Sequence, residues 1–275
     1  MNIRSRFALP VLSALLTALV LSANAWSRPL QTVLNEGKLR VGVALASPWA
    51  IRDDSGKLEG FEVDVAKRLA ADMKVQPVIL PYAWNKLIPA LESGEIDLIA
   101  AGMTITPERA LHVNFSQPYA SGGINLATNL HSTANVKTLE DLDNQSYKLA
   151  AVKGSVAVAL ARRILPKTNL VLFDDAKAAG SALVAGKVDA YLEDEPVPTF
   201  LALENPGKID VPIAEPLLTT PAGFAVAKGE PDFLAFLNAW ITARTADTWL
   251  PTTHQYWFKS LAWRKEKHDE DGAGH

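Results

Sequence analysis

Two residues in the first half of the chain, Arg109 and Thr104, have the chemistry to hold an anion. Thr106 and Pro107 suit the N-cap and the first position of a helix, which places Arg109 in the first helical turn. The helix macrodipole disfavours a cation there by about 0.3–1 kcal/mol, so a compensating group is expected. A bound carboxylate would compensate by accepting a bidentate pair from Arg109 and bonds from the Thr104 hydroxyl and nearby backbone N–H groups. An ion pair from Arg109 to Glu108 or another surface acid explains the same sequence.

Three adjacent carboxylates in the second half, Glu193, Asp194 and Glu195, have the opposite preference. A carboxylate at this place could hold an ammonium group, although acidic clusters are also common in solvated turns. A carboxylate receptor that faces an ammonium receptor suits a zwitterion. The two segments together therefore point to a small ligand that carries both charges.

Two tryptophans stand at predicted loops on the same side of the first half. Trp49 follows Pro48 after the first predicted strand, and Trp84 precedes the helix that is predicted from Lys86. Either ring could cover the apolar part of a ligand or stack on a cation. Packing into a core is the alternative for each tryptophan taken alone.

The elements that must position these residues alternate between strands and helices. Short apolar runs predict strands, and amphipathic stretches predict helices. The predicted strands are 39–43, 77–80 and 96–100, and the predicted helices are 62–73 and 86–91. This alternation indicates an α/β fold with a largely parallel sheet.

An internal repeat suggests that the chain contains two such units. Segment 91–99 recurs as 183–191, each with a helix end, a glycine, a β-branched residue, an aspartate and a strand. Helix–Gly–strand junctions are common in α/β folds, so chance similarity is the alternative. The repeat gives Gly102 and Asp194 equivalent places just after their strands, where open α/β sheets bind ligands. If two lobes face each other, both positions look into a shared cleft.

The composition excludes several classes of protein. The chain has 275 residues, of which 48% are hydrophobic and 21% charged, with a formal net charge of −3 and no cysteine. These values exclude a disordered chain, a disulfide scaffold and a thiol enzyme, and without a basic excess no nucleic-acid partner is expected. Nucleophile-elbow, paired-histidine and phosphate-loop patterns are absent from the sequence. We therefore expect no enzymatic activity, no metal and no cofactor.

The N-terminus has the pattern of a secretory signal peptide. Two arginines precede the apolar run 7–21, and small residues at 23 and 25 suit a signal peptidase, so residues 1–25 are predicted to be removed. The apolar run is shorter than the roughly 20 residues that a membrane-spanning helix needs. Because no cysteine could carry a lipid, we expect free diffusion in a periplasm, with loss to the medium as the alternative. The charged segment 264–275 is predicted to be a disordered tail.

Short motifs follow one another through nearly all of the remaining chain. They are Gly37–Val43, Gly60–Ala66, Trp84 with Leu87–Leu91, Gly94–Asp97, Ala101–Arg109, Phe115–Tyr119, Lys153–Ser155 and Gly186–Ala190. In this order and spacing they resemble the family 3 extracellular solute-binding proteins, the periplasmic receptors of polar amino-acid ABC importers. The resemblance implies a two-lobed periplasmic binding protein fold of type II. Each lobe would be a mostly parallel sheet flanked by helices, and two hinge strands would join the lobes.

The resemblance also implies lobe boundaries. Lobe one would comprise residues 26–121 and 222–263, and lobe two residues 122–221. The hinge crossings would lie near 122–127 and 217–223.

One group of residues would bind the carboxylate of an amino acid by this resemblance. Arg109, Thr104 and the Gly102 backbone would take the α-carboxylate, and Ser155 would touch it from lobe two. Val156 stands where the family commonly has threonine or serine, so lobe two is expected to hold the carboxylate less fully.

A second group would bind the rest of the ligand. Asp194 would take the α-ammonium, Trp84 would stack, and Glu193 would help to read the side chain. The loop at 44–46 lacks the aspartate and aromatic residue that the family usually carries there. An ammonium partner and a stacking wall are therefore missing unless Trp49 substitutes.

The leading hypothesis is a monomeric periplasmic protein that captures an amino acid or similar small zwitterion and delivers it to an ABC permease. Glu193 favours a cationic or amide side chain on the ligand, whereas Lys153 and Lys86 favour an acidic one. One alternative is an enzyme that resembles cyclohexadienyl dehydratases, with Glu193 or Glu195 as general acid if burial raises its pKa. Another alternative is a binding protein that reports to a membrane sensor or serves an oxidase system.

Overall fold

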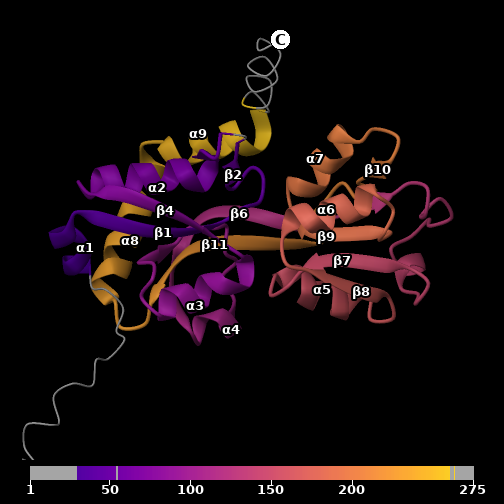
Figure 1. Cartoon of the computed structure of the whole chain (residues 1–275), viewed down its shortest axis with the longest axis horizontal. Coiled ribbons are helices and arrows are strands. Elements are labelled where there is room, and N and C mark those ends of the chain that lie inside the picture. Colours follow the sequence, from indigo (N-terminus) through magenta and orange to yellow (C-terminus); the bar gives the residue numbers. More distant parts are fainter. Residues whose placement is uncertain (1–29, 54, 261–262, 264–275) are drawn as a thin grey trace, which may run out of the picture.

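The structure, a computed structural model, describes residues 30–53, 55–260 and 263. The predicted signal peptide 1–25 and the predicted tail 264–275 lie outside the described residues. Two groups of strands and helices lie side by side, joined by the long strands β6 (Val113–Asn129) and β11 (Leu218–Ala227) (Figure 1). We call the elements before β6 and after β11 lobe one, and the elements between them lobe two.

Lobe one is built on three parallel strands in the order β4-β1-β5. These strands are β1 (Lys38–Ala44), β4 (Gln76–Tyr82) and β5 (Leu98–Ile99). Most of β1 is buried, as expected for a strand that helices cover on both faces. Helix α2 (Phe61–Asp72) packs in one apolar cluster and α3 (Leu87–Glu92) in another. The smaller elements are α1 (Leu30–Glu36), β2 (Ile51–Arg52), β3 (Leu58–Glu59), η1 (Trp84–Lys86) and α4 (Pro107–Ala110).

Lobe two repeats this plan with the order β9-β7-β8, again parallel. Its strands are β7 (Lys148–Val152), β8 (Asn169–Phe173) and β9 (Ala190–Asp194). Its helices are α5 (Val156–Ile164), α6 (Ala176–Val184) and α7 (Val197–Glu204), with η2 (Glu140–Leu142) and the short strand β10 (Ile209–Asp210) on β6.

The two lobes share one continuous sheet. Strand β11 runs antiparallel to both β5 and β6, and β6 runs antiparallel to β9. Each lobe therefore has three parallel strands completed by one long antiparallel strand. The expected two-lobed α/β fold is confirmed, with mixed rather than purely parallel pairing at the crossing strands. The lobe boundaries given above stay predictions.

The sequence repeat is also a repeat of geometry. Gly94 and Gly186 take left-handed conformations, with φ of 75° and 67°, just after α3 and α6. Asp97 Oδ2 accepts a bond from the Arg40 backbone N–H at 2.8 Å, at the start of β1. Asp189 Oδ2 accepts the corresponding bond from the first residue of β7 at 2.7 Å. Both aspartates thus fix the start of a neighbouring strand.

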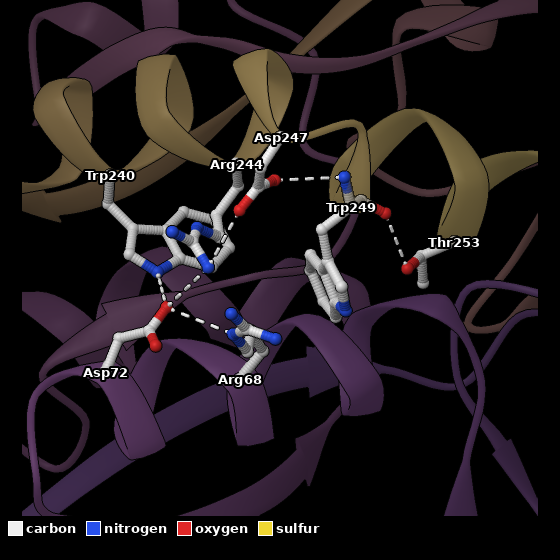
Figure 2. A network of polar contacts seen from close by, with 7 residues as sticks. All are labelled: Arg68, Asp72, Trp240, Arg244, Asp247, Trp249 and Thr253. Atoms are coloured by element: carbon white, nitrogen blue, oxygen red, sulfur yellow. Dashed lines mark hydrogen bonds and ion pairs between the residues drawn. The ribbon is translucent and has the colours of Figure 1, made fainter.

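The chain closes lobe one with α8 (Pro231–Ala246), α9 (Trp249–Gln255) and η3 (Tyr256–Ser260). Figure 2 shows how α8 docks on α2: the Asp72 carboxylate accepts from Trp240 Nε1 at 2.8 Å and lies 3.7 Å from Arg244 Nη1. Within α2 the same carboxylate accepts from Arg68 Nε at 3.2 Å. The guanidinium of Arg68 also lies 5.4 Å from the ring of Trp249 at the start of α9. In the described part of the chain, no helix combines the length and apolarity needed to cross a membrane.

Candidate functional site

A cavity of about 470 Å³ lies between the lobes, at the carboxyl ends of their parallel strands. Lobe one contributes residues that follow β1, β4 and β5, and lobe two contributes residues that follow β7, β8 and β9. The lining residues used below are Leu45, Trp49, Arg52, Trp84, Gly102, Ser155, Asp174, Asp175, Ala176, Lys177, Glu193, Asp194 and Val197. This is the edge at which open α/β sheets bind ligands.

Asp194 gives the cavity a carboxylate at the end of β9. Its Oδ1 accepts a hydrogen bond from the Thr220 hydroxyl of β11 at 3.0 Å, so a crossing strand holds the acid in place. Burial, and then the neighbouring charge of Glu193, raise the pKa of Asp194 from 3.8 to about 7. A carboxylate in this condition would gain from an ammonium group brought beside it.

Glu193 is buried and takes a different set of partners. Its Oε2 accepts from the Tyr191 hydroxyl at 2.5 Å, and its Oε1 accepts from the Asp194 backbone N–H at 3.0 Å. Burial raises the pKa of Glu193, and these two hydrogen bonds act in the opposite direction. Glu193 lines the cavity but is held by its own strand.

Arg109 reaches from lobe one to lobe two. Its Nη1 donates to the Thr104 carbonyl at 2.9 Å and its Nη2 donates to the Gly154 carbonyl at 2.8 Å. The guanidinium also lies 5.4 Å from the Trp84 ring. Burial lowers the pKa of Arg109, while the charges of Asp194 and Glu108 act against that change. Among the described residues Arg109 has no ion pair, so backbone carbonyls supply the compensation that its place in α4 requires.

The Gly154 carbonyl is where the two lobes meet. Besides Arg109, it accepts from Trp84 Nε1 at 3.1 Å, so two side chains of lobe one converge on one acceptor of lobe two. Ser155 follows directly and occupies the N-cap position of α5, but its side chain makes no capping hydrogen bond. Its Oγ is buried without a hydrogen-bond partner among the described residues. A buried hydroxyl at the positive end of a nine-residue helix is suited to an anionic oxygen.

The floor of the cavity rests on a buried acid that sequence reasoning missed. Gly102 has φ of 61°, and the ring of Trp49 packs directly against its Cα. The Gly102 N–H donates to Glu62 Oε1 at 2.6 Å, and the Tyr119 hydroxyl donates to the same oxygen at 2.5 Å. Glu62 lies in the first turn of α2, where an acid is favourable in any case, so its position gave no signal of a further role.

The predicted site residues are only partly assembled in this conformation. Six of them line the 470 Å³ cavity: Trp49, Trp84, Gly102, Ser155, Glu193 and Asp194. Thr104 and Arg109 do not line it. Arg109 instead lines an adjoining cavity of about 640 Å³ that shares Trp84 and Ser155 with the first. The amide expected to bind a carboxylate, that of Gly102, points to Glu62 here.

Comparisons with known proteins show the family and the fold of the chain. Residues 39–260 match the family described as "bacterial extracellular solute-binding proteins, family 3". The chain is 32% identical to the glutamine-binding protein GlnH of Bacillus subtilis, over 74% of each chain. A solved structure of a putative ABC-transporter binding component from Wolinella succinogenes, complexed with lysine, is 32% identical with a TM-score of 0.77 and covers 83% of this chain and 99% of its own. Cyclohexadienyl dehydratase of Pseudomonas aeruginosa is 29% identical over 63% of this chain and 65% of its own.

Proposed function

Because the chain belongs to the bacterial extracellular solute-binding proteins of family 3, we propose that it captures an amino acid or a similar small zwitterion between its lobes and delivers it to an ABC permease. The observation that carries this proposal is that Asp194 and Ser155 line the same inter-lobe cavity. Asp194 forms no ion pair among the described residues, with Arg109 acting on it only through its charge, and Ser155 has an unsatisfied buried hydroxyl. Asp194 binds the α-ammonium, and Ser155 with the start of α5 binds the α-carboxylate.

Arg109 completes the carboxylate site when the ligand enters. Its two present acceptors are neutral carbonyls, and a carboxylate forms the stronger, charge-assisted pair with a guanidinium. Trp84, which already lies against this guanidinium, covers the bound ligand. Ligand groups that touch both lobes stabilise the closed form, and closure is favoured only by that difference in affinity.

The related enzymes make a second function worth testing, because Glu193 is a buried acid on the cavity wall whose pKa is raised. In that alternative Glu193 acts as general acid for loss of a leaving group. Glu195, the other acid considered, accepts from Asn125 and Thr199 and does not line the cavity. Turnover of arogenate or prephenate that disappears in Glu193→Gln would establish the enzyme. We favour the binding protein, acting as an exported monomer in the periplasm.

The test is calorimetry of the chain without its signal peptide, against the common amino acids, small amines and organic acids. Asp194→Asn and Arg109→Gln should each weaken binding of the ligand by about tenfold to a hundredfold, because each leaves one ligand charge without its partner. The matched controls are Asp210→Asn and Arg162→Gln, which line none of the cavities described above and should leave the dissociation constant unchanged. Silence across the panel, or full affinity in both site variants, would refute the proposal.

A further inference from the structure

The inter-lobe cavity continues outward into a second space. A cavity of about 860 Å³ lies between the β2 region of lobe one and helices α6 and α7 of lobe two, elements that face each other in Figure 1. It shares five lining residues with the 470 Å³ cavity: Leu45, Arg52, Ala176, Lys177 and Val197. We call these five residues the junction. A ligand whose α-amino and α-carboxyl groups occupy the inner cavity therefore has room to extend its side chain through the junction.

The junction carries two cations from opposite lobes. Arg52 ends β2 in lobe one, and Lys177 lies in the first turn of α6 in lobe two. Arg52 Nη1 donates to the Gly56 carbonyl at 3.1 Å. Neither cation has an acidic partner within the part of the chain that the structure describes. The other three junction side chains are aliphatic and provide a wall without hydrogen-bonding groups.

Three acids near the junction have partners of their own. Asp174 forms an ion pair with Lys153 at 2.7 Å. Asp175 caps α6 by accepting from the Ala178 N–H at 2.7 Å. Asp53 accepts from the Lys57 N–H at 2.8 Å and from a neighbouring serine. Glu204 also lines the outer cavity, and Glu193 and Asp194 line the inner one. Arg52 and Lys177 form no ion pair with an acid among the described residues, so both cations are available to a ligand.

These contacts also bear on Lys153 and Lys86, the two lysines that suggested an acidic ligand in the sequence. Lys153 forms an ion pair with Asp174, and Lys86 lines neither cavity. Neither lysine is therefore placed at the junction, where the cations are Arg52 and Lys177.

We propose that the ligand is an amino acid whose side chain ends in an anionic group, and that Arg52 and Lys177 bind this group from the two lobes. The inference rests on the proposed function and names the substrate class of that same site. An anion held by both lobes can make its two contacts only when they approach, so it favours closure. A cationic side chain that reached the junction would lie near Arg52 and Lys177, which carry like charge. The outer cavity leaves room for a side chain longer than that of glutamate.

The test is calorimetry with L-glutamate and L-2-aminoadipate against L-glutamine, L-lysine and L-arginine at equal ionic strength. The two acids should bind at least about tenfold more tightly than glutamine, and the two cationic amino acids should bind most weakly. Arg52→Gln and Lys177→Gln should each weaken binding of the acids by about tenfold and leave glutamine within about twofold. Matched controls are Arg163→Gln and Lys187→Gln, which line neither cavity.

The possible failures are distinct. If lysine, arginine or glutamine binds as tightly as the acids, the inference is overturned while the proposed function stands. If neither junction variant changes the ratio of acid to glutamine affinity, Arg52 and Lys177 do not read the side chain, and the inference is again overturned. If no amino acid of any charge binds, both proposals are refuted.

Discussion

Glu62 offers the sharpest test of the structure, because it is a carboxyl group with almost no contact with water. One oxygen, Oε1, accepts from both Gly102 and Tyr119, and the other, Oε2, is buried without a partner among the described residues. Burial raises the pKa of Glu62 from 4.5 to about 8, and the two hydrogen bonds only partly oppose this. At neutral pH the folded protein therefore holds Glu62 mainly in its protonated form.

The raised pKa makes folding stability depend on pH with a defined sign. Between pH 4.5 and about 8 the folded state binds a proton that the unfolded state has lost, so stability falls as pH rises through this window. A pKa change of this size corresponds to about 4 to 5 kcal/mol in the free energy of unfolding, as an order of magnitude. Glu62→Gln removes this dependence and keeps an oxygen to accept both hydrogen bonds.

The assay is urea unfolding at several pH values between 5 and 9, followed by tryptophan fluorescence. Glu62→Gln should match the unchanged protein near pH 5 and exceed it in stability by several kcal/mol at pH 9. Glu140→Gln, at an exposed position, is the control and should show no pH-dependent difference. A stability difference between Glu62→Gln and the unchanged protein that stays constant across the range would refute the argument for a buried neutral acid.

Two further changes test the cavity itself. The pKa of Asp194 is about 7 without ligand, so below that pH a ligand ammonium must displace a proton from Asp194. The dissociation constant should therefore rise about tenfold for each pH unit from 7 down to 5 and stay level above 7. Calorimetry at several pH values between 5 and 8 measures this, and a flat profile would contradict the role of Asp194. Gly102→Ala should lower both the melting temperature and ligand affinity, because φ is 61° and the new Cβ would lie 3.0 Å from Trp49. Gly207→Ala, with φ of 76° and open space, should cost only the backbone strain, so equal losses of stability in the two variants would argue against the contact with Trp49.

Local sequence signals predicted the elements that position the site. Strand 39–43 and helix 62–73 are found as β1 and α2 with ends shifted by one residue, because their apolar spacing matches burial in the sheet and on the helix. The glycines at 94 and 186 end their helices in the left-handed conformation, which glycine adopts at little cost because it has no Cβ. Strand 96–100 is shorter than predicted, since β5 comprises only Leu98–Ile99, although the backbone N–H groups of Asp97 and Ala100 still donate to carbonyls of β1.

The contacts between lobes could not be predicted from these signals. The sequence left open whether Arg109 pairs with a ligand or with Glu108, and the structure gives it backbone carbonyls at residues 104 and 154. Residue 154 lies in the other lobe, so no local pattern relates the two. Lys153 likewise suggested a ligand contact until its partner, Asp174, was placed beside it by the pairing of β7 with β8. Such partners depend on tertiary packing, which charge and periodicity alone do not encode.

The Gly154 carbonyl links ligand capture to the position of the lobes. It accepts from both Trp84 and Arg109, so the lobes already touch in this conformation through two donors on a neutral oxygen. In the proposed function a ligand carboxylate would bind Arg109, so the Gly154 carbonyl would keep the Trp84 bond and the guanidinium would exchange a neutral acceptor for an anion. At Arg109, only the free-energy difference between its bond to the Gly154 carbonyl and its pair with the ligand carboxylate contributes to ligand affinity. A ligand without a carboxylate would lose one lobe contact and gain none, so an amino-acid amide, which keeps the ammonium but replaces the carboxylate by an uncharged group, should bind weakly even where its side chain fits.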